Sequence, residues 1–429
     1  MPEKITLNHV CKVEGHGSLY VEIEQGKVKR CELGSVEGAR YFEGIIKGRH
    51  YSEIPEIVSR ICGICSCAHT VCSIKAIENA FDVKVSAQVQ LLRELLTIGE
   101  RIRSHATHLY LLALPDYLGY ESAIAMAPHY KKEVQRALEL VKLGNNIVEI
   151  IGGREMHPVT PVIGGFTKVI AKKDCEQLLK RLKDMKEDAR VTANLFLNIK
   201  YPAFERKTDH VSLKQLDSFP LIEGKIVSMN GLDIEQRDYL KHLEEYIEER
   251  STAKFSVKKD KSYLVGALAR INTNMKLLSK DTEQVLKKSR IKFPSTNPFH
   301  NNVAQALELL HWIDIAITAF EKQEFRPEDV QKVKPKKARG IAAVEAPRGI
   351  LFHDYTFDEK GFLEKANIVT PTAQNLRNLE EDIKAYLELL LKQEKPKDEI
   401  VLEIEKLIRA YDPCFSCSTH FLNVTWKET

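Results

Sequence analysis

The stretch Arg60-Ile-Cys-Gly-Ile-Cys-Ser-Cys-Ala-His-Thr70 is the part of the chain around which we expect the fold to be built. It places Cys62 and Cys65 three positions apart, with His69 one helical turn later. Two thiolates at this spacing can reach one metal ion, and the glycine between them lets the backbone turn tightly enough for the sulfurs to converge. By itself the pair equally fits half of a structural zinc site, a redox-active dithiol or the ligands of a cluster.

A second pair with the same spacing lies near the other end of the chain, in Asp412-Pro-Cys-Phe-Ser-Cys-Ser-Thr-His420. Cys414 and Cys417 bring the number of thiolates available for one site to four. The chain has nine cysteines, an odd number, which favours metal ligation in a reducing compartment over a disulfide framework.

The composition is that of an ordinary globular protein. With 429 residues, 43% hydrophobic and 29% charged, the chain can bury one large core or two moderate ones. Its 64 basic and 60 acidic residues are interspersed, so the net charge of +4 gives no reason to expect nucleic acid or an anionic membrane as partner. We see no apolar run that reads as a membrane span and no export signal, and we therefore expect a cytoplasmic protein.

Hydrophobic periodicity predicts a mainly α, α+β fold with a central bundle of long helices. An N-terminal β-hairpin or small sheet is expected within residues 5–36, turning at Gln25-Gly26, and a peripheral α+β elaboration is expected at 200–262. We treat 1–420 as a single domain. The main helices are predicted at 88–114 (stopped by Pro115), 128–151, 172–195, 235–249, 303–323, 372–391 and 397–411.

Several single residues have both a functional and a structural interpretation. Glu14, in Lys12-Val-Glu-Gly-His16, could relay protons at a buried centre or lie on a surface strand. Arg348 is fixed between Pro347 and Gly349, so its guanidinium could be aimed at a target, although a structural salt bridge is the default for a lone arginine.

Three further positions favour the structural interpretation. His105 and His108 share one helix face, which is more often a polar seam in a bundle than a pair of metal ligands. Asp116 follows a predicted helix end and is typical of a solvated cap, and Glu43 is ambiguous on its own. The glycine-rich segment 152–158 lacks the lysine and hydroxyl of a P-loop, so we do not expect nucleotide binding there.

The motifs together resemble the large subunit of nickel-iron hydrogenases, from residue 9 to residue 420. The matching segments are Lys12-Val-Glu-Gly-His16, Arg60-Ile-Cys-Gly-Ile-Cys65 with His69, Ser104-His-Ala-Thr-His-Leu-Tyr110, Gly152-Gly-Arg-Glu-Met-His-Pro158, Glu345-Ala-Pro-Arg-Gly349 with His353, and Asp412-Pro-Cys-Phe-Ser-Cys417 with His420. Within the family, the short chain and Lys12 are similar to the cytosolic bidirectional branch, in particular the α subunits of archaeal sulfhydrogenases.

The resemblance implies a catalytic subunit that cleaves H2 reversibly and heterolytically at a buried centre. Nickel would be held by Cys62, Cys65, Cys414 and Cys417, and an iron carrying carbon monoxide and cyanide would be bridged by Cys65 and Cys417. Soft thiolates suit both metals.

The resemblance also implies roles around the metals. Cys414 would take the proton and Glu14 would relay it outward. Arg348 would lie above the open site, oriented by Asp116 and Asp412. Pro347 would shape the same canopy, and His69 would donate a hydrogen bond to a bridging sulfur.

A magnesium-type ion is implied near the C-terminus, on Glu43, His420 and a main-chain carbonyl close to Ile368. The segment Thr370-Pro-Thr-Ala-Gln-Asn375 departs from the usual family pattern beside this site. A maturation endopeptidase would cut after His420, which makes 421–429 a precursor tail.

Electrons would leave through another subunit. Cys11, Cys31, Cys67, Cys72 and Cys175 show no cluster-ligand spacing, so a small iron-sulfur subunit is implied, docked around Arg154 and His157. Further flavin and iron-sulfur diaphorase subunits would connect it to NAD(P) or sulfur. The alternatives are a hydrogen-sensing regulatory hydrogenase, a structural zinc protein with four cysteine ligands, and a subunit of a related quinone oxidoreductase, which lacks the nickel cysteines.

Overall fold

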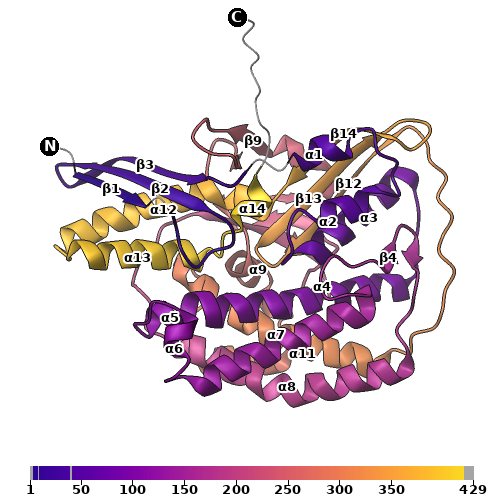
Figure 1. The fold of residues 1–429 in the computed structure, drawn as a ribbon, viewed down its shortest axis with the longest axis horizontal. Coiled ribbons are helices and arrows are strands. Elements are labelled where there is room, and N and C mark those ends of the chain that lie inside the picture. Colours follow the sequence, from indigo (N-terminus) through magenta and orange to yellow (C-terminus); the bar gives the residue numbers. More distant parts are fainter. Residues whose placement is uncertain (1–2, 8, 39–40, 420–429) are drawn as a thin grey trace, which may run out of the picture.

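Four long helices lie side by side in the lower half of the view in Figure 1. In the computed structural model, which describes residues 3–7, 9–38 and 41–419, they are α4 (Ala87–Thr107), α7 (Lys131–Gly152), α8 (Lys172–Asn198) and α11 (Asn301–Lys322). They pack α4 on α7 and α11 on both α8 and α4, burying the apolar face that the sequence periodicity predicted. The α+β class is confirmed, but a bundle at the centre of the molecule is not, because small sheets and other helices fill the upper half of the same view.

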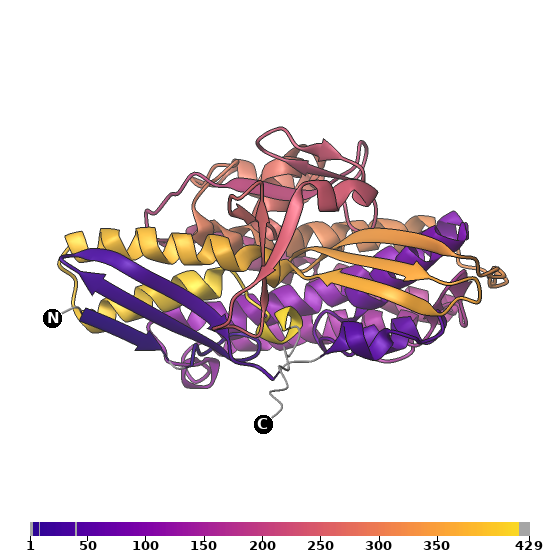
Figure 2. The same cartoon turned by 90° about the horizontal axis from the view of Figure 1, so that it is seen from above.

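Two antiparallel three-stranded sheets lie on either side of the short helix α14 (Phe415–Ser418), as Figure 2 shows. The first contains β1 (Glu3–Leu7), β2 (Gly17–Glu24) and β3 (Lys27–Ser35). Its hairpin turns at Gln25-Gly26, where both residues have positive φ, so the predicted hairpin is confirmed. The second contains β12 (Ala338–Ala346), β13 (Gly349–Phe357) and β14 (Leu363–Val369).

Residues 200–262 form strands, and the helix predicted at 235–249 is wrong. A 3₁₀ turn spans Gln236–Lys241, and the chain then enters β9 (Leu243–Ile247), which pairs with β10 (Lys254–Lys258). Charged residues suggested a helix here, but cross-strand pairing with β10 overrides that propensity. The other strands of this region are β6 (Asp209–Lys214), β7 (Lys225–Ser228) and β8 (Asp233–Ile234), with β11 (Tyr263–Leu264) beside β6. The single-domain assignment of 1–420 stays a prediction.

The predicted helix 88–114 does not stop at Pro115. After α4 the chain makes a π-helical segment, His108–Ala113, and then a short helix α5 (Leu114–Tyr117) in which Pro115 occupies the first turn. A proline is tolerated at this position because the N–H groups of a first helical turn have no acceptor within the helix, so the N–H that proline lacks is not needed. The helical run therefore ends at Tyr117, three residues later than expected.

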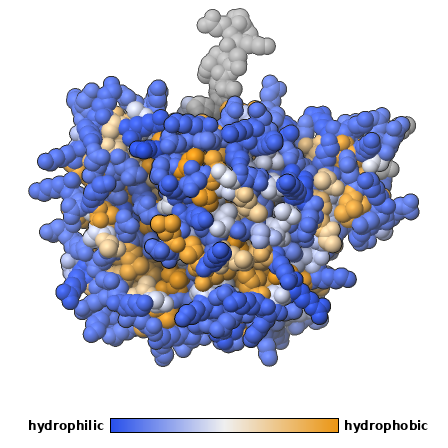
Figure 3. All heavy atoms as spheres, turned by 180° about the vertical axis from the view of Figure 1, so that it is seen from behind, coloured by the Kyte–Doolittle hydropathy of each residue, from blue (hydrophilic) through white to orange (hydrophobic). Residues whose placement is uncertain are grey.

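One helix, Pro298–Lys322, is long and apolar enough to cross a membrane, but 78% of its most apolar window is buried inside the protein. It is therefore a core helix of this fold. Figure 3 shows the reverse face of the molecule, where hydrophilic side chains dominate and hydrophobic ones gather in patches between them.

The last helices carry the chain back to the first cysteine pair. α12 (Pro371–Lys392) and α13 (Lys397–Ala410) confirm two predicted helices and lead to α14. The remaining elements are α1 (Phe42–Ile46), α2 (Ile54–Ser59), α3 (Ser66–Phe81), α6 (Ala123–Met126), β4 (Pro161–Val162), β5 (Gly165–Phe166), α9 (Ala267–Asn274), the 3₁₀ turn Met275–Leu277, α10 (Lys280–Lys287) and the 3₁₀ turn Pro298–His300. His420 and the predicted tail lie outside the described residues.

Candidate metal centre

Each cysteine pair lies at the start of a helix. Cys65 is the N-cap residue of α3, and Cys62 lies in the turn just before it. Cys414 is the N-cap residue of α14, and Cys417 lies within that helix. All four side chains are buried, because α3 and α14 are enclosed by the sheets and by α12.

The four sulfurs converge as the spacing predicted. Cys62 Sγ lies 3.6 Å from Cys414 Sγ, and Cys65 Sγ lies 3.3 Å from Cys417 Sγ. All four Sγ atoms lie within 4.8 Å of one another, and they form the only such cluster of ligand atoms in the described part of the chain. Four soft donors at this separation can bind one metal ion or a pair of metals.

Burial and proton sharing set the charge of this cluster. Hydrogen bonds from the other three thiols, above all Cys414, hold the pKa of Cys62 well below its ordinary value. Burial raises the pKa of Cys414 and of Cys417 well above theirs. A buried cluster that concentrates negative charge on sulfur calls for a cation, so its chemistry fits a thiolate-bound metal centre.

Glu14 reaches this cluster directly. The Cys414 thiol donates a hydrogen bond to Glu14 Oε2 at 2.8 Å, and the Ser416 backbone N–H donates to the same oxygen at 3.2 Å. The Ser416 hydroxyl donates to Glu14 Oε1. Gly15 makes this approach possible: its φ is +80°, and a Cβ there would lie 2.8 Å from Ser416 N. The surface-strand interpretation of Glu14 is therefore wrong.

Arg348 lies at the cavity beside the sulfurs and is held by Asp412. Its Nε donates to the Asp412 carbonyl at 2.7 Å and its Nη2 to Asp412 Oδ1 at 3.0 Å. Burial alone would lower the pKa of Arg348, but Asp412 and the nearby thiols raise it well above its ordinary value, so the guanidinium stays charged. Its buried Nη1 has no hydrogen-bond partner among the described residues, which leaves the two N–H groups of that nitrogen free beside the cavity.

Asp116 does not orient Arg348, contrary to what the resemblance implied. Its two carboxylate oxygens pair with Lys12 and Arg409. The second group that holds Asp412 is instead Gln305, whose amide donates to Asp412 Oδ2 at 3.0 Å. Asp116 is linked to Asp412 only indirectly. The Arg409 side chain donates to Asp116, the Arg409 carbonyl contacts His108, and His108 contacts Gln305.

His69 also has a different partner from the one expected. Its Nδ1 lies 3.1 Å from His353 Nε2, and no hydrogen bond joins it to a sulfur in the described structure. Burial lowers the pKa of His69 to about 4, so it is neutral at pH 7. His69 still lines the cavity together with Cys65 and Cys417. Pro347 is buried, and its carbonyl accepts a hydrogen bond from Arg270.

The structural interpretation of His105 and His108 is confirmed. His105 Nε2 lies 2.8 Å from Glu308 Oε2, and His108 contacts Gln305 Oε1 and the Arg409 carbonyl. Both rings are buried between helices and belong to a polar seam, and the described residues form no metal-ligand cluster around them.

The described residues do not fit the predicted magnesium site. Glu43 Oε1 accepts the Ile368 backbone N–H at 2.7 Å, so this carboxylate oxygen already has a hydrogen-bond partner. Lys254 Nζ lies 3.3 Å from the same oxygen, 3.1 Å from Asn367 Oδ1 and 3.6 Å from Glu245 Oε2. An ammonium group is thus the partner of the Glu43 carboxylate, whereas a divalent cation would need hard oxygen ligands at about 2.1 Å. His420 lies outside the described residues.

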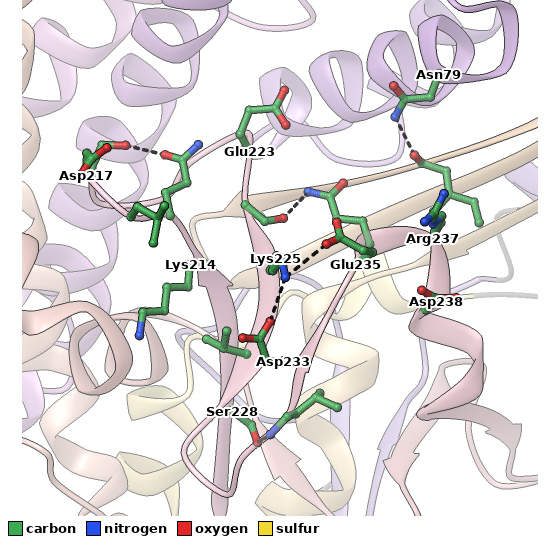
Figure 4. Close-up of a pocket in the computed structure, with 18 of the residues that line it drawn as sticks. Asn79, Lys214, Asp217, Glu223, Lys225, Ser228, Asp233, Glu235, Arg237 and Asp238 are labelled. Carbon is green, nitrogen blue, oxygen red and sulfur yellow. Dashed lines mark hydrogen bonds and ion pairs between the residues drawn. The ribbon is translucent and has the colours of Figure 1, made fainter.

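The space at the sulfurs is small. Cys65, His69, Arg348, Cys414 and Cys417 line an enclosed cavity of about 10 Å³. A much larger cleft, of about 1620 Å³, lies elsewhere, between residues 214–238 and the start of β12. Figure 4 shows Lys225 of this cleft paired with Asp233 and Glu235, and no cysteine or histidine among the described residues lines it. The buried cavity is therefore the candidate site.

Sequence reasoning missed Ser416, Gln305 and Thr372, whose hydroxyl accepts the Cys414 N–H at 2.9 Å. It also missed Glu100, whose carboxylate accepts the N–H groups of Cys67 and Ala68 at the start of α3. Only Ser416 carried a usable signal, because it lies between the two C-terminal cysteines.

Comparison with known proteins agrees with this site. The family described as nickel-dependent hydrogenase matches residues 40–139 and 252–420. The chain is 36% identical over 426 residues to sulfhydrogenase 1 subunit alpha of Pyrococcus furiosus, covering 98% of each chain. It is 34% identical over 424 residues to sulfhydrogenase 2 subunit alpha of the same organism, covering 98% of this chain and 100% of the relative.

A solved structure has the same fold. The crystal structure of an NAD+-reducing NiFe-hydrogenase in the H2-reduced state superposes with a TM-score of 0.87 at 25% identity, over 97% of this chain and 99% of that one. The family match spans both cysteine pairs, and these are the residues that the fold brings together. The chain therefore belongs to the nickel-dependent hydrogenase family and is a hydrogenase large, catalytic subunit.

Proposed function

We propose that this subunit cleaves H2 reversibly and heterolytically at a nickel-iron centre held by Cys62, Cys65, Cys414 and Cys417. The observation that carries the proposal is the convergence of four buried thiols beside one carboxylate and one guanidinium. Nickel, with iron carrying carbon monoxide and cyanide on Cys65 and Cys417, would supply the site at which H2 is polarised and split. The four thiol donors suit both metals.

Glu14 accepts the proton in this proposal. The Cys414 thiol is 1% exposed and donates to Glu14 Oε2 at 2.8 Å, within the range for direct proton transfer. Glu14 and its neighbours Val13 and Gly15 are half-buried and His16 is exposed, so the carboxylate lies between the buried sulfur and a partly exposed loop. Ser416 fixes both carboxylate oxygens and keeps the acceptor facing Cys414.

Arg348 acts as a fixed charge and hydrogen-bond donor rather than as a base. Asp412 holds two of its nitrogens, and the free Nη1 donor remains for a group in the cavity. Because its neighbours raise the pKa of Arg348, the guanidinium stays protonated at any working pH and cannot accept a further proton. We therefore assign proton transfer to the Cys414–Glu14 pair alone.

Electrons leave through a partner subunit that carries iron-sulfur clusters. The five other cysteines form no ligand cluster in the described structure. The loop Arg154–Val159 lies against the Cys62 turn, since His157 Nδ1 contacts the Ser59 carbonyl at 2.9 Å and Met156 and Val159 are about half exposed. This apolar surface close to the cysteines supports docking there.

The electron acceptor is proposed from the relatives. The alpha designation of the two sulfhydrogenase relatives supports further subunits, which we propose to be flavin and iron-sulfur diaphorase subunits. The solved structure of an NAD+-reducing hydrogenase supports NAD(P) as acceptor, with sulfur as the alternative. A cytoplasmic location and cleavage after His420 complete the proposal. Magnesium has no part in it, because Lys254 pairs with Glu43, the acidic ligand that the ion would need.

Infrared spectroscopy of the protein purified anaerobically from its native host tests the proposal. We expect sharp bands in the window where metal-bound carbon monoxide and cyanide absorb, and we expect them to shift under H2. Metal analysis of the same sample should give nickel and iron. Zinc without nickel or iron, and no such bands, would refute the proposal and favour a structural zinc site, which four cysteines also satisfy.

A further inference from the structure

Arg348 lies in a two-residue turn whose position is not set by Asp412 alone. Pro347 and Arg348 connect β12 to β13, and the flanking residues Ala346 and Gly349 form the last pair of the ladder. Asp412 holds the tip of the Arg348 side chain. The backbone of the turn needs separate contacts, because carbonyl groups that point away from the sheet have no ladder partner.

Arg270, in α9, supplies these contacts from below the turn. Its Nη2 donates to the Pro347 carbonyl at 2.9 Å, and its Nη1 donates to the Ala346 carbonyl at 3.1 Å. Arg270 is completely buried. One guanidinium therefore holds the two consecutive carbonyls that immediately precede Arg348.

Two carboxylates fix the Arg270 guanidinium in turn. Glu308 of α11 accepts from Nε at 2.5 Å and from Nη2 at 2.7 Å, and Glu345 of β12 accepts from Nη1 at 3.0 Å. With the two carbonyls, these contacts use all five N–H donors that a guanidinium has. A lysine, with three donors and no planar fork, cannot reproduce the set.

The turn also rests on the start of α9. Gly266, the N-cap residue of α9, has φ of +122°, and a Cβ there would lie 3.0 Å from the Arg348 carbonyl oxygen. Arg101 adds a bond to the Glu345 carbonyl. The buried cluster pairs two arginines with two carboxylates, so it is electrically balanced and ties the turn to the long helices α4 and α11.

We propose that Arg270 is a positioning residue for the reaction: it fixes the Ala346–Pro347 carbonyls and thereby sets where the Arg348 guanidinium lies over the four thiols. The inference rests on the proposed role of Arg348. Buried ion pairs contribute little to stability on balance, whereas they can specify one conformation. A displacement of about 1 Å at a reacting group can cost on the order of 100-fold in rate.

The test combines Arg270→Lys with Arg348→Lys in a double-mutant cycle on the metal-loaded complex. We expect Arg270→Lys to lower kcat for H2 oxidation by about 10- to 100-fold with nickel and iron content unchanged. In the Arg348→Lys background, the same substitution should lower kcat by less than about two-fold, because the group that it positions has already been altered. Thermal unfolding of each variant measures the stability loss separately.

Arg93→Lys is the matched control. Arg93 is equally buried and makes a bidentate pair with Glu78 at 2.8 and 2.6 Å, away from the Arg348 turn. Its substitution should lower the melting temperature by a similar amount while kcat stays within about two-fold of wild type. Glu345→Gln is used if Arg270→Lys does not fold, because it removes one negative charge next to Arg270 but keeps a hydrogen-bond acceptor. We expect it to lower kcat less than Arg270→Lys does, and to have no further effect on kcat in the Arg348→Lys background.

The outcomes separate the two proposals. Full activity of Arg348→Lys would remove Arg348 from the proposed function and overturn the Arg270 inference with it. Loss in Arg348→Lys together with independent, multiplying losses from Arg270→Lys or Glu345→Gln would overturn only the inference. A loss of metal in Arg270→Lys would also overturn it, since that would make Arg270 a structural support of the thiols.

Discussion

Replacing Glu14 by glutamine tests the proposed proton route most directly. Three donors converge on this carboxylate: the Cys414 thiol, the Ser416 N–H and the Ser416 hydroxyl. The side-chain carbonyl of glutamine can still accept the first two, and the hydroxyl can rotate to accept from the amide. We therefore expect Glu14→Gln to lower the free energy of unfolding by only about 1 kcal/mol.

The rate should change far more, because an amide cannot accept the proton. General acid–base groups contribute about 10²- to 10⁴-fold, so kcat for H2 oxidation should fall by that factor, equivalent to about 3–5 kcal/mol of activation free energy. The assay is H2-dependent dye reduction by the anaerobic complex, with metal content and melting temperature measured on the same sample.

Glu37→Gln is the control for this experiment. Glu37 accepts the N–H of His16, which lies in the same loop as Glu14, at 2.8 Å, but Glu37 does not contact a sulfur. Its substitution should therefore leave kcat within about two-fold of wild type. Glu14→Gln with full metal content and a kcat within about three-fold of wild type would refute the assignment of proton transfer to Glu14.

Three further predictions follow from other contacts. Burial raises the pKa of Glu100 to about 7, above the unfolded value of about 4.3, so the free energy of unfolding should fall as pH rises through this window. Glu100→Gln should remove up to about 3 kcal/mol of that pH dependence, as measured by denaturant titration at pH 5 and pH 8; identical pH profiles for the two proteins would contradict this. Elemental analysis of the purified enzyme should find nickel and iron but no stoichiometric magnesium, because Lys254 sits against Glu43; one magnesium per chain after gel filtration would show the reasoning to be wrong. Met156→Glu should abolish co-purification of the iron-sulfur partner, whereas Ile124→Glu, at a side chain that is 86% exposed on α6, should not; equal retention of the partner by both variants would move the docking surface elsewhere.

The sequence predicted the metal centre well because its ligands come in short motifs. The three-residue spacing of each cysteine pair is fixed by the covalent chain. Each pair could therefore be expected to bring two sulfurs close together. Helices with sustained apolar periodicity, such as α4 and α12, were predictable for a similar reason, since a buried stripe requires the 3.6-residue repeat.

The sequence was a poor guide where several partners of the same chemistry were available. Asp116 could have paired with any of the buried arginines, and packing places it against Arg409 and Lys12 rather than Arg348. Glu43 matched a metal ligand in type, yet β10 brings Lys254 to it. Residues 235–249 had the charges of a surface helix but meet a neighbouring strand.

The sequence by itself thus determined the four thiols, the candidate proton acceptor Glu14 and the candidate guanidinium Arg348. Only the tertiary structure decided the other groups that hold them: Ser416 at Glu14, Gln305 at the Asp412 carboxylate that holds Arg348, and Arg270 at the turn before Arg348. The physical reason is that ligand spacing is local, whereas the hydrogen-bond partners of a buried charge come from distant segments and are selected by the packing of the whole core.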